Sequence, residues 1–151
     1  MATLWDAGDR AAISARINRL DAALAPQWGK MSAVQMMTHL IEGFKIAFNE
    51  KPVLVIPGKN PPAEIRQAII FSPNPWPTAT YIAPAEYGAD AWDTSQIDEY
   101  RQTLHAYLQR FTQTPETIQW GRHAYFDELT TEEWGALTYK HIDHHLRQFG
   151  C

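Results

Sequence analysis

Residues 130–149 read TTEEWGALTYKHIDHHLRQF and predict a long helix. Thr130 and Glu133 stand three residues apart, the spacing of a capping box at a helix N-terminus. Beyond them, one helical face collects the residues that recur every three or four positions: Trp134, Leu137, Thr138, His141, His145 and Phe149. We therefore expect an amphipathic helix over residues 131–149 with two histidines on its inward face.

Two segments nearer the N-terminus have the same periodicity. Residues 8–24 place four aliphatic side chains at spacings of four, three and four, and Pro26 marks the end of this predicted helix. A second capping box, Ser32 with Gln35, opens a helix predicted to run to about Asn49. The buried face of that helix is expected to contain Met36, Leu40, Phe44 and Phe48.

A further long helix is predicted after Thr94 and Ser95, which are potential caps, and Pro115 marks its end. Its apolar stripe consists of Ile97, Tyr100, Leu104, Tyr107, Leu108 and Phe111. Before it, residues 52–84 hold eight of the ten prolines, and only residues 64–71 among them have a helical pattern. The four long helices and this connection predict an all-α fold, a four-helix bundle with a long proline-rich crossover between its second and third helices.

Length and composition limit the classes of function. A chain of 151 residues has the usual size of one domain, so we expect a single bundle over residues 1–151. The 13 Lys and Arg against 17 Asp and Glu form no basic stripe, which argues against nucleic-acid binding. No apolar run approaches the ~20 residues that cross a bilayer, and the N-terminus lacks a signal-peptide pattern, so we expect a cytoplasmic protein without membrane contact. The only cysteine, Cys151, allows no internal disulfide.

The histidines are the residues that point to chemistry. His141 and His145 lie four residues apart on the last helix, so their rings can converge on one ion. His144 competes with His145, because a spacing of three also converges, but the helical register favours His145. His39, on the inward side of the second helix, is the candidate third ligand. Three imidazoles would hold a transition metal and leave a coordination position open; the alternative is a set of hydrogen-bonded core histidines.

Other polar residues near this face leave alternatives open. Glu42 could orient a ligand or act as a base, but pairing with Lys45 at the surface is favoured. His105 is expected at the edge of a helix stripe, and His123 either at the mouth of the bundle or in a turn or capping role. The last helix lacks the His-Glu pair of a metalloprotease, because Ile142 follows His141.

The two ends of the chain together resemble the DinB-like (YfiT-type) superfamily of metal-binding four-helix bundles. The similar segments are residues 28–32 leading into 36–40, WGKMS and MMTHL, and residues 129–149, which contain YKHIDHHLRQF. The resemblance implies that His39, His141 and His145 bind a divalent metal, zinc or nickel, and that the protein forms a homodimer. The common His-Arg-Gly-Gln ending of the family is altered here, since Leu146 and Arg147 replace Arg-Gly, whereas Gln148 is kept.

Superfamily members of known activity include thiol-dependent S-transferases and isomerases. The resemblance therefore implies a metal-dependent enzyme that acts on a small-molecule substrate with a low-molecular-weight thiol. The alternative is a non-catalytic metal- or ligand-binding bundle, with a stress-response role among its options, in which His144 or Glu42 supplies a fourth ligand. The sequence identifies no catalytic residue and does not name the substrate.

Overall fold

The structure is a computed structural model that describes residues 1–78 and 93–151. In this part of the chain all regular secondary structure is helical, which confirms the all-α prediction. The elements, in chain order, are α1 (Ala7–Ile17), α2 (Ala33–Ala47), α3 (Ala63–Phe71), η1 (Thr94–Gln96), α4 (Ile97–Arg110), η2 (Pro115–Thr117) and α5 (Thr131–Gln148). None of the described helices is both long enough and apolar enough to cross a membrane.

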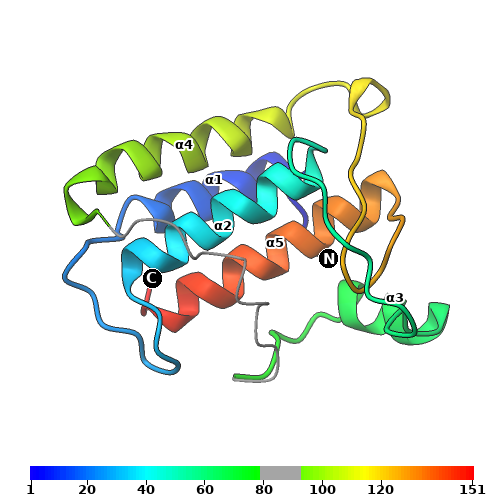
Figure 1. Ribbon diagram of the computed structural model, residues 1–151. Coiled ribbons are helices and arrows are strands. Elements are labelled where there is room, and N and C mark those ends of the chain that lie inside the picture. Colours follow the sequence, from blue (N-terminus) through cyan, green and yellow to red (C-terminus); the bar gives the residue numbers. More distant parts are fainter. Residues whose placement is uncertain (79–92) are drawn as a thin grey trace.

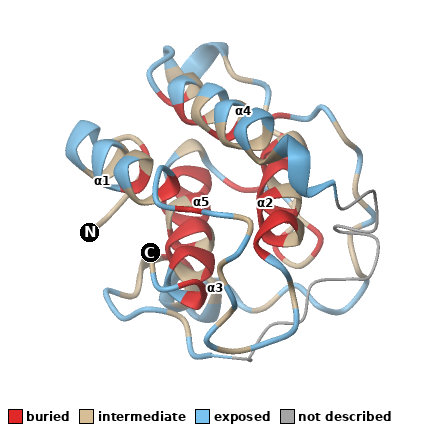
Figure 2. Ribbon diagram, turned by 90° about the vertical axis from the view of Figure 1, so that its left-hand side faces the viewer, coloured by how far each residue is buried: buried red, intermediate tan, exposed pale blue. Residues whose placement is uncertain are grey.

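The four longer helices, α1, α2, α4 and α5, lie alongside one another (Figure 1). Helices α1 and α2 each pack against both α4 and α5, and the short helix α3 packs against α5. Figure 2 shows that α2 and α5 are mostly buried, whereas α1 and α4 each present an exposed face. The inward faces of α2 and α5 therefore meet inside the molecule, which is where the sequence places its histidines.

Aromatic side chains hold α2 against α4. The Phe44 and Tyr107 rings stack with centroids 5.1 Å apart and planes 3° apart, and the Phe48 and Phe111 rings meet edge to face at 5.4 Å. Trp120 stacks on Phe48 at 5.3 Å. Such pairs contribute about 0.5–1.5 kcal/mol each beyond the burial of their surface.

The structure confirms both predicted capping boxes. The backbone N–H of Gln35 donates to Ser32 Oγ at 3.1 Å, and the backbone N–H of Ser32 donates to Gln35 Oε1 at 2.7 Å. At α5, the N–H of Glu133 donates to Thr130 Oγ1 at 3.2 Å and the N–H of Thr130 to Glu133 Oε2 at 2.8 Å. These caps satisfy N–H groups that a helix start leaves unpaired, and they set where α2 and α5 begin.

Two predicted boundaries are wrong. Helix α1 ends at Ile17 rather than at residue 24, because the N–H groups of Arg19 and Leu20 donate to carbonyls three residues back, at 3.0 and 3.1 Å, instead of four. The Leu20 carbonyl then accepts a hydrogen bond from Arg101 of α4 at 2.6 Å. Thr94 and Ser95 belong to the 3₁₀ turn η1 rather than capping a helix directly. Asp93 supplies the cap, because its carboxylate accepts from the Ser95 N–H at 2.9 Å.

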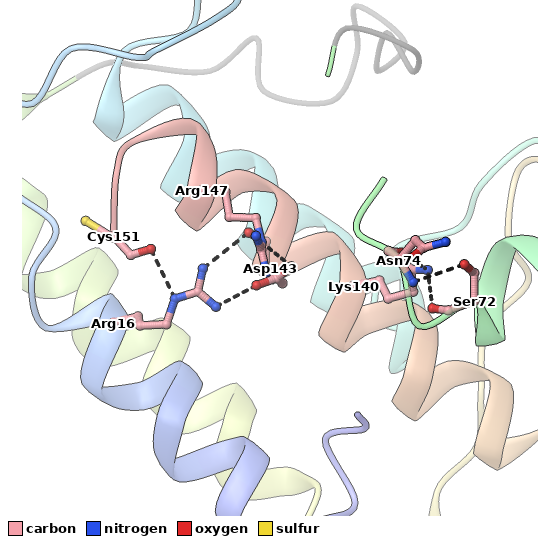
Figure 3. A network of polar contacts seen from close by, with 7 residues as sticks. All are labelled: Arg16, Ser72, Asn74, Lys140, Asp143, Arg147 and Cys151. Carbon is pink, nitrogen blue, oxygen red and sulfur yellow. Dashed lines mark hydrogen bonds and ion pairs between the residues drawn. The ribbon is translucent and has the colours of Figure 1, made fainter. Parts of the chain in front are cut away.

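Hydrogen bonds anchor the described part of the proline-rich crossover to the turn that contains Ala124 and to α5. The Ile56 N–H donates to the Ala124 carbonyl at 2.9 Å. The Lys140 ammonium of α5 donates to the carbonyls of Ser72 and Asn74 at 2.8 and 3.0 Å (Figure 3). These bonds hold residues 72–76 against α5; the remainder of the predicted crossover, including Pro84, lies outside the described residues.

The opposite side of α5 is bound to α1 through Asp143. This carboxylate accepts from Arg16 and from Arg147, at 2.7 Å in each case (Figure 3). Arg16 also donates to the carbonyl of Cys151 at 3.1 Å, which holds the C-terminus in place. Asp143 is thus used in packing and faces away from the histidine side of α5.

Candidate metal centre

The structure brings His39, His141 and His145 together between α2 and α5. The Nε2 atoms of His39 and His141 lie 2.8 Å apart, and the His145 ring centroid lies 4.8 Å from that of His39 and 4.9 Å from that of His141. One nitrogen from each ring can be chosen so that all three lie within 4.8 Å of one another. Three ligand atoms this close can hold one metal ion, as the helical spacing predicts.

Gly43 on α2 leaves room for the His141 ring. Gly43 faces the His141 ring, and a Cβ at this glycine would lie 3.4 Å from His141 Cε1. A larger side chain at residue 43 would therefore press on the ring. His39 itself is buried, whereas His141 is partly exposed, to a cavity beside the three rings.

A hydrogen-bond chain determines which nitrogen of His145 is available. The Gln148 amide donates to the Trp28 carbonyl at 2.8 Å, and because a carbonyl only accepts, the opposite amide atom, Oε1, faces His145. Gln148 Oε1 lies 2.8 Å from His145 Nδ1. Nδ1 must therefore carry the ring proton, which leaves Nε2 with the lone pair that a metal requires.

The His141 and His145 rings are neutral at neutral pH, which suits metal binding. Burial lowers the pKa of His145 to about 3, helped by the nearby His39 and against the effect of the Gln148 hydrogen bond. Burial also holds the pKa of His141 well below its usual value, with further lowering by His39 and His145. Metal ligands must be deprotonated, so neutral imidazoles at neutral pH suit a metal site.

Three imidazole nitrogens form a donor set that transition metals accept. Two nitrogens bound to one tetrahedral zinc at 2.0–2.1 Å are about 3.3 Å apart. The His39 and His141 Nε2 atoms lie 2.8 Å apart, which is shorter than this spacing, and the three candidate nitrogens lie within 4.8 Å of one another, so the rings would shift on binding one ion. The contact between the fixed Gln148 and His145 provides the second-shell support that such sites usually have.

The other candidate residues lie outside the cluster. His144 faces the same cavity, between the rings of Trp28 and Trp76 at 5.8 and 6.1 Å, and hydrogen-bonds to the Trp76 backbone. Glu42 pairs with Lys45 at 2.6 Å and Lys51 at 2.5 Å, which confirms the surface interpretation.

The other two histidines have separate surroundings. His105 bonds Ser14 and Asn18 on α1 at 3.1 and 2.8 Å, as expected of a residue at the edge of a helix stripe. His123 accepts hydrogen bonds within its own turn and also lines the cavity, so both roles considered for it are present.

The cavity beside the three histidines has a volume of about 430 Å³. Its described lining is mainly apolar and aromatic and includes no Asp or Glu; among the lining residues are Leu40, Phe44, Ile69, Trp76, Phe126, Leu137 and Ile142. This size lies at the lower end of the range for small-molecule sites. The geometry therefore combines a cluster of potential metal ligands with space for a small, largely apolar molecule.

Sequence reasoning missed three of these contributions. The role of Gln148 depends on a spacing of three from His145, a signal that is visible in the sequence but is not specific by itself. The carbonyl of Trp28 and the position of Trp76 have no sequence signature, because their parts of the chain reach the site only through tertiary packing.

No protein-family model, curated protein or solved structure matches the chain.

Proposed function

We propose that this protein is a metal-dependent enzyme with a DinB-like four-helix-bundle fold, and that it transfers a small thiol to an electrophilic substrate. His39, His141 and His145 would hold a divalent transition metal, zinc or nickel. The observation that carries the proposal is the convergence of these three histidines at the wall of a mainly apolar cavity. A divalent metal bound there would lower the pKa of a thiol or water that coordinates it.

The lining of the cavity supports thiol chemistry over hydrolysis with a carboxylate base. Among the described lining residues there is no Asp or Glu that could take a proton from water. A thiol that loses its proton on binding needs no such base. In the transfer, the sulfur forms a bond to the electrophilic carbon, the leaving group departs with its bonding pair, and the thiol proton goes to solvent.

A non-catalytic ligand-binding role is the second candidate, and the same lining favours it. The cavity offers apolar surface and fixed rings, and its described lining contains no carboxylate to act as a base. The two functions differ in turnover. A panel of low-molecular-weight thiols with a chromogenic electrophile, such as 1-chloro-2,4-dinitrobenzene, distinguishes them.

The first experiment is elemental analysis of tag-free protein purified without chelator. We expect near-stoichiometric zinc or nickel in the parent, and its loss in His39→Ala and His145→Ala. His105→Ala is the matched control, because His105 bonds α1 residues outside the cluster, and it should keep the metal. Little metal in the parent, even after reconstitution with zinc or nickel, would overturn the metal-dependent proposal.

Turnover is then measured on the metal-loaded protein. We expect thiol-dependent product formation in the parent and in His105→Ala, and none in His145→Ala. Metal binding without turnover of any thiol in the panel would reject the transferase and leave the ligand-binding role.

A further inference from the structure

His123 has its ring proton assigned by its own turn. The backbone N–H groups of Tyr125 and Phe126 both point at His123 Nδ1, at 3.1 and 3.3 Å. Backbone N–H groups only donate, so Nδ1 must be the acceptor and cannot carry a proton. In the neutral ring the proton is therefore on Nε2, which is a hydrogen-bond donor.

The surroundings hold this ring in one orientation. It stacks on Phe126 with centroids 4.8 Å apart and lies edge to face on Trp134 at 5.9 Å. The backbones of His123 and Asp127 exchange two hydrogen bonds of 2.8 Å, which closes the turn. Burial lowers the pKa of His123 to about 4, so the ring is neutral at neutral pH.

The Nε2–H donor of His123 lies beside the cavity and has no hydrogen-bond partner among the described residues. His123 lines the same cavity as the three candidate metal ligands, yet it is not part of their cluster. Within residues 1–78 and 93–151, nothing accepts a hydrogen bond from its Nε2. A fixed donor beside an otherwise mainly apolar cavity is the usual means by which a small-molecule site orients its ligand.

We propose that the Nε2–H of His123 binds the acceptor oxygen of a small, largely apolar carbonyl compound in this cavity. His123 would then be a substrate-binding residue that fixes the orientation of this compound relative to His39, His141 and His145. The reaction of the bound compound rests on the proposed function. The binding of this compound does not rest on it, because the His123 donor, its turn and the cavity are formed by the protein without a metal.

The test uses the full-length, metal-free protein, so that no ion can bind the oxygen. The probes are acetophenone and α-methylstyrene, which have the same shape but differ in the C=O group. One neutral hydrogen bond corresponds to a preference of about 3- to 10-fold, so we expect acetophenone to bind more tightly by that factor. Dissociation constants are measured by NMR titration.

His123→Asn is the decisive variant. Its Oδ1 can still accept the N–H two residues ahead, as in an Asx turn, whereas its only donor, the Nδ2 amide group, lies closer to the backbone than the Nε2–H that it replaces. We expect the two probes to bind this variant equally, with an unchanged Kd for α-methylstyrene. His105→Asn, outside the cavity, should keep the preference. Long-range ¹H–¹⁵N spectra should show a proton on His123 Nε2 in the parent.

Three results would overturn the proposal: a preference that persists in His123→Asn, a proton on Nδ1, or no saturable binding of either probe. All three are independent of metal content. A failure here therefore leaves the metal proposal intact, and loss of the metal proposal leaves this one testable.

Discussion

At the residue scale, the state of His145 is decided by a side chain one turn further along α5. Gln148 cannot rotate its amide without losing its bond to the Trp28 carbonyl, so it presents an oxygen to His145 Nδ1. This contact specifies the tautomer and the ring orientation together. Such outer contacts typically contribute a factor of 10–100 to metal affinity.

We therefore expect Gln148→Leu to weaken zinc binding about 10- to 100-fold while the protein remains folded. Leucine keeps most of the buried volume but leaves both tautomers of His145 accessible. Competition with a chromogenic chelator gives the affinity. Gln67→Leu is the control, because Gln67 also bonds a residue of α5, Glu133 at 3.1 Å, and it should leave the zinc affinity unchanged. Equal affinities of parent and Gln148→Leu would show that the tautomer does not matter.

At the scale of elements, the segment that connects α1 to α2 helps to build the site. It presents the Trp28 carbonyl to α5, and the Gln27 N–H donates to the Gln148 carbonyl at 2.7 Å. Gly29 makes this approach possible. It has φ +78°, and a Cβ there would lie 2.7 Å from Gln148 Nε2. The connection and the helix end are therefore packed too closely for any side chain at residue 29.

A pair of glycines separates backbone strain from this contact. Gly58 has φ +72°, but a Cβ there would meet nothing within 4 Å. We expect Gly58→Ala to lower the free energy of unfolding by about 1–2 kcal/mol, the cost of a left-handed alanine. Gly29→Ala should cost more and should also weaken zinc binding, because it displaces Gln148. Urea unfolding and zinc competition check both; an identical loss in the two variants, with zinc affinity retained, would contradict the role of this contact.

At the scale of the whole molecule, the aromatic core and the histidine cluster are distinct parts of one interior. The rings of Phe44, Phe48 and Phe111 hold α2 to α4, whereas the histidines lie where α2 meets α5. His141 and His145 are kept neutral mainly by burial. An interior with buried neutral histidines is sensitive to acid, because unfolding allows them to bind protons.

The pKa of His123 determines the direction in which the free energy of unfolding changes with pH. Its pKa is about 4 in the folded chain, against 6.5 for the exposed group, so the unfolded state binds more protons between these values. The stability from this group is complete above pH 6.5 and is lost as the pH falls toward 4. We expect the metal-free parent to lose about 2 kcal/mol more than His123→Asn between pH 7 and pH 5.

Urea unfolding at pH 7, 6 and 5 in the presence of chelator measures this difference. His105→Asn is a suitable comparison, because His105 is less buried and its pKa is lowered to a smaller degree. Parallel pH profiles for the parent and His123→Asn would show that His123 titrates normally in the folded chain.

Much of the fold and of the candidate site follows from local sequence rules. Helix starts are predictable where a capping box is present, since the bonds of Ser32 and Thr130 join residues three apart. The predicted end of α1 is wrong, because the chain turns through three-residue hydrogen bonds at Arg19 and Leu20, which the apolar periodicity does not indicate. The three histidines were predicted from periodicity, which places His141 and His145 on one face and His39 on the inward side of another helix.

The sequence by itself determined the helical class, the inward faces and the ligand-type residues, because each depends on spacing within one helix. The tertiary structure alone decided the tautomers of His145 and His123 and the cavity that these residues border. These features depend on a carbonyl, a turn or a ring supplied by a remote segment. Residue spacing specifies in which direction a side chain points from its own helix. The distances between side chains of different elements, and the tautomers of the histidines, depend on the segments that pack against that helix.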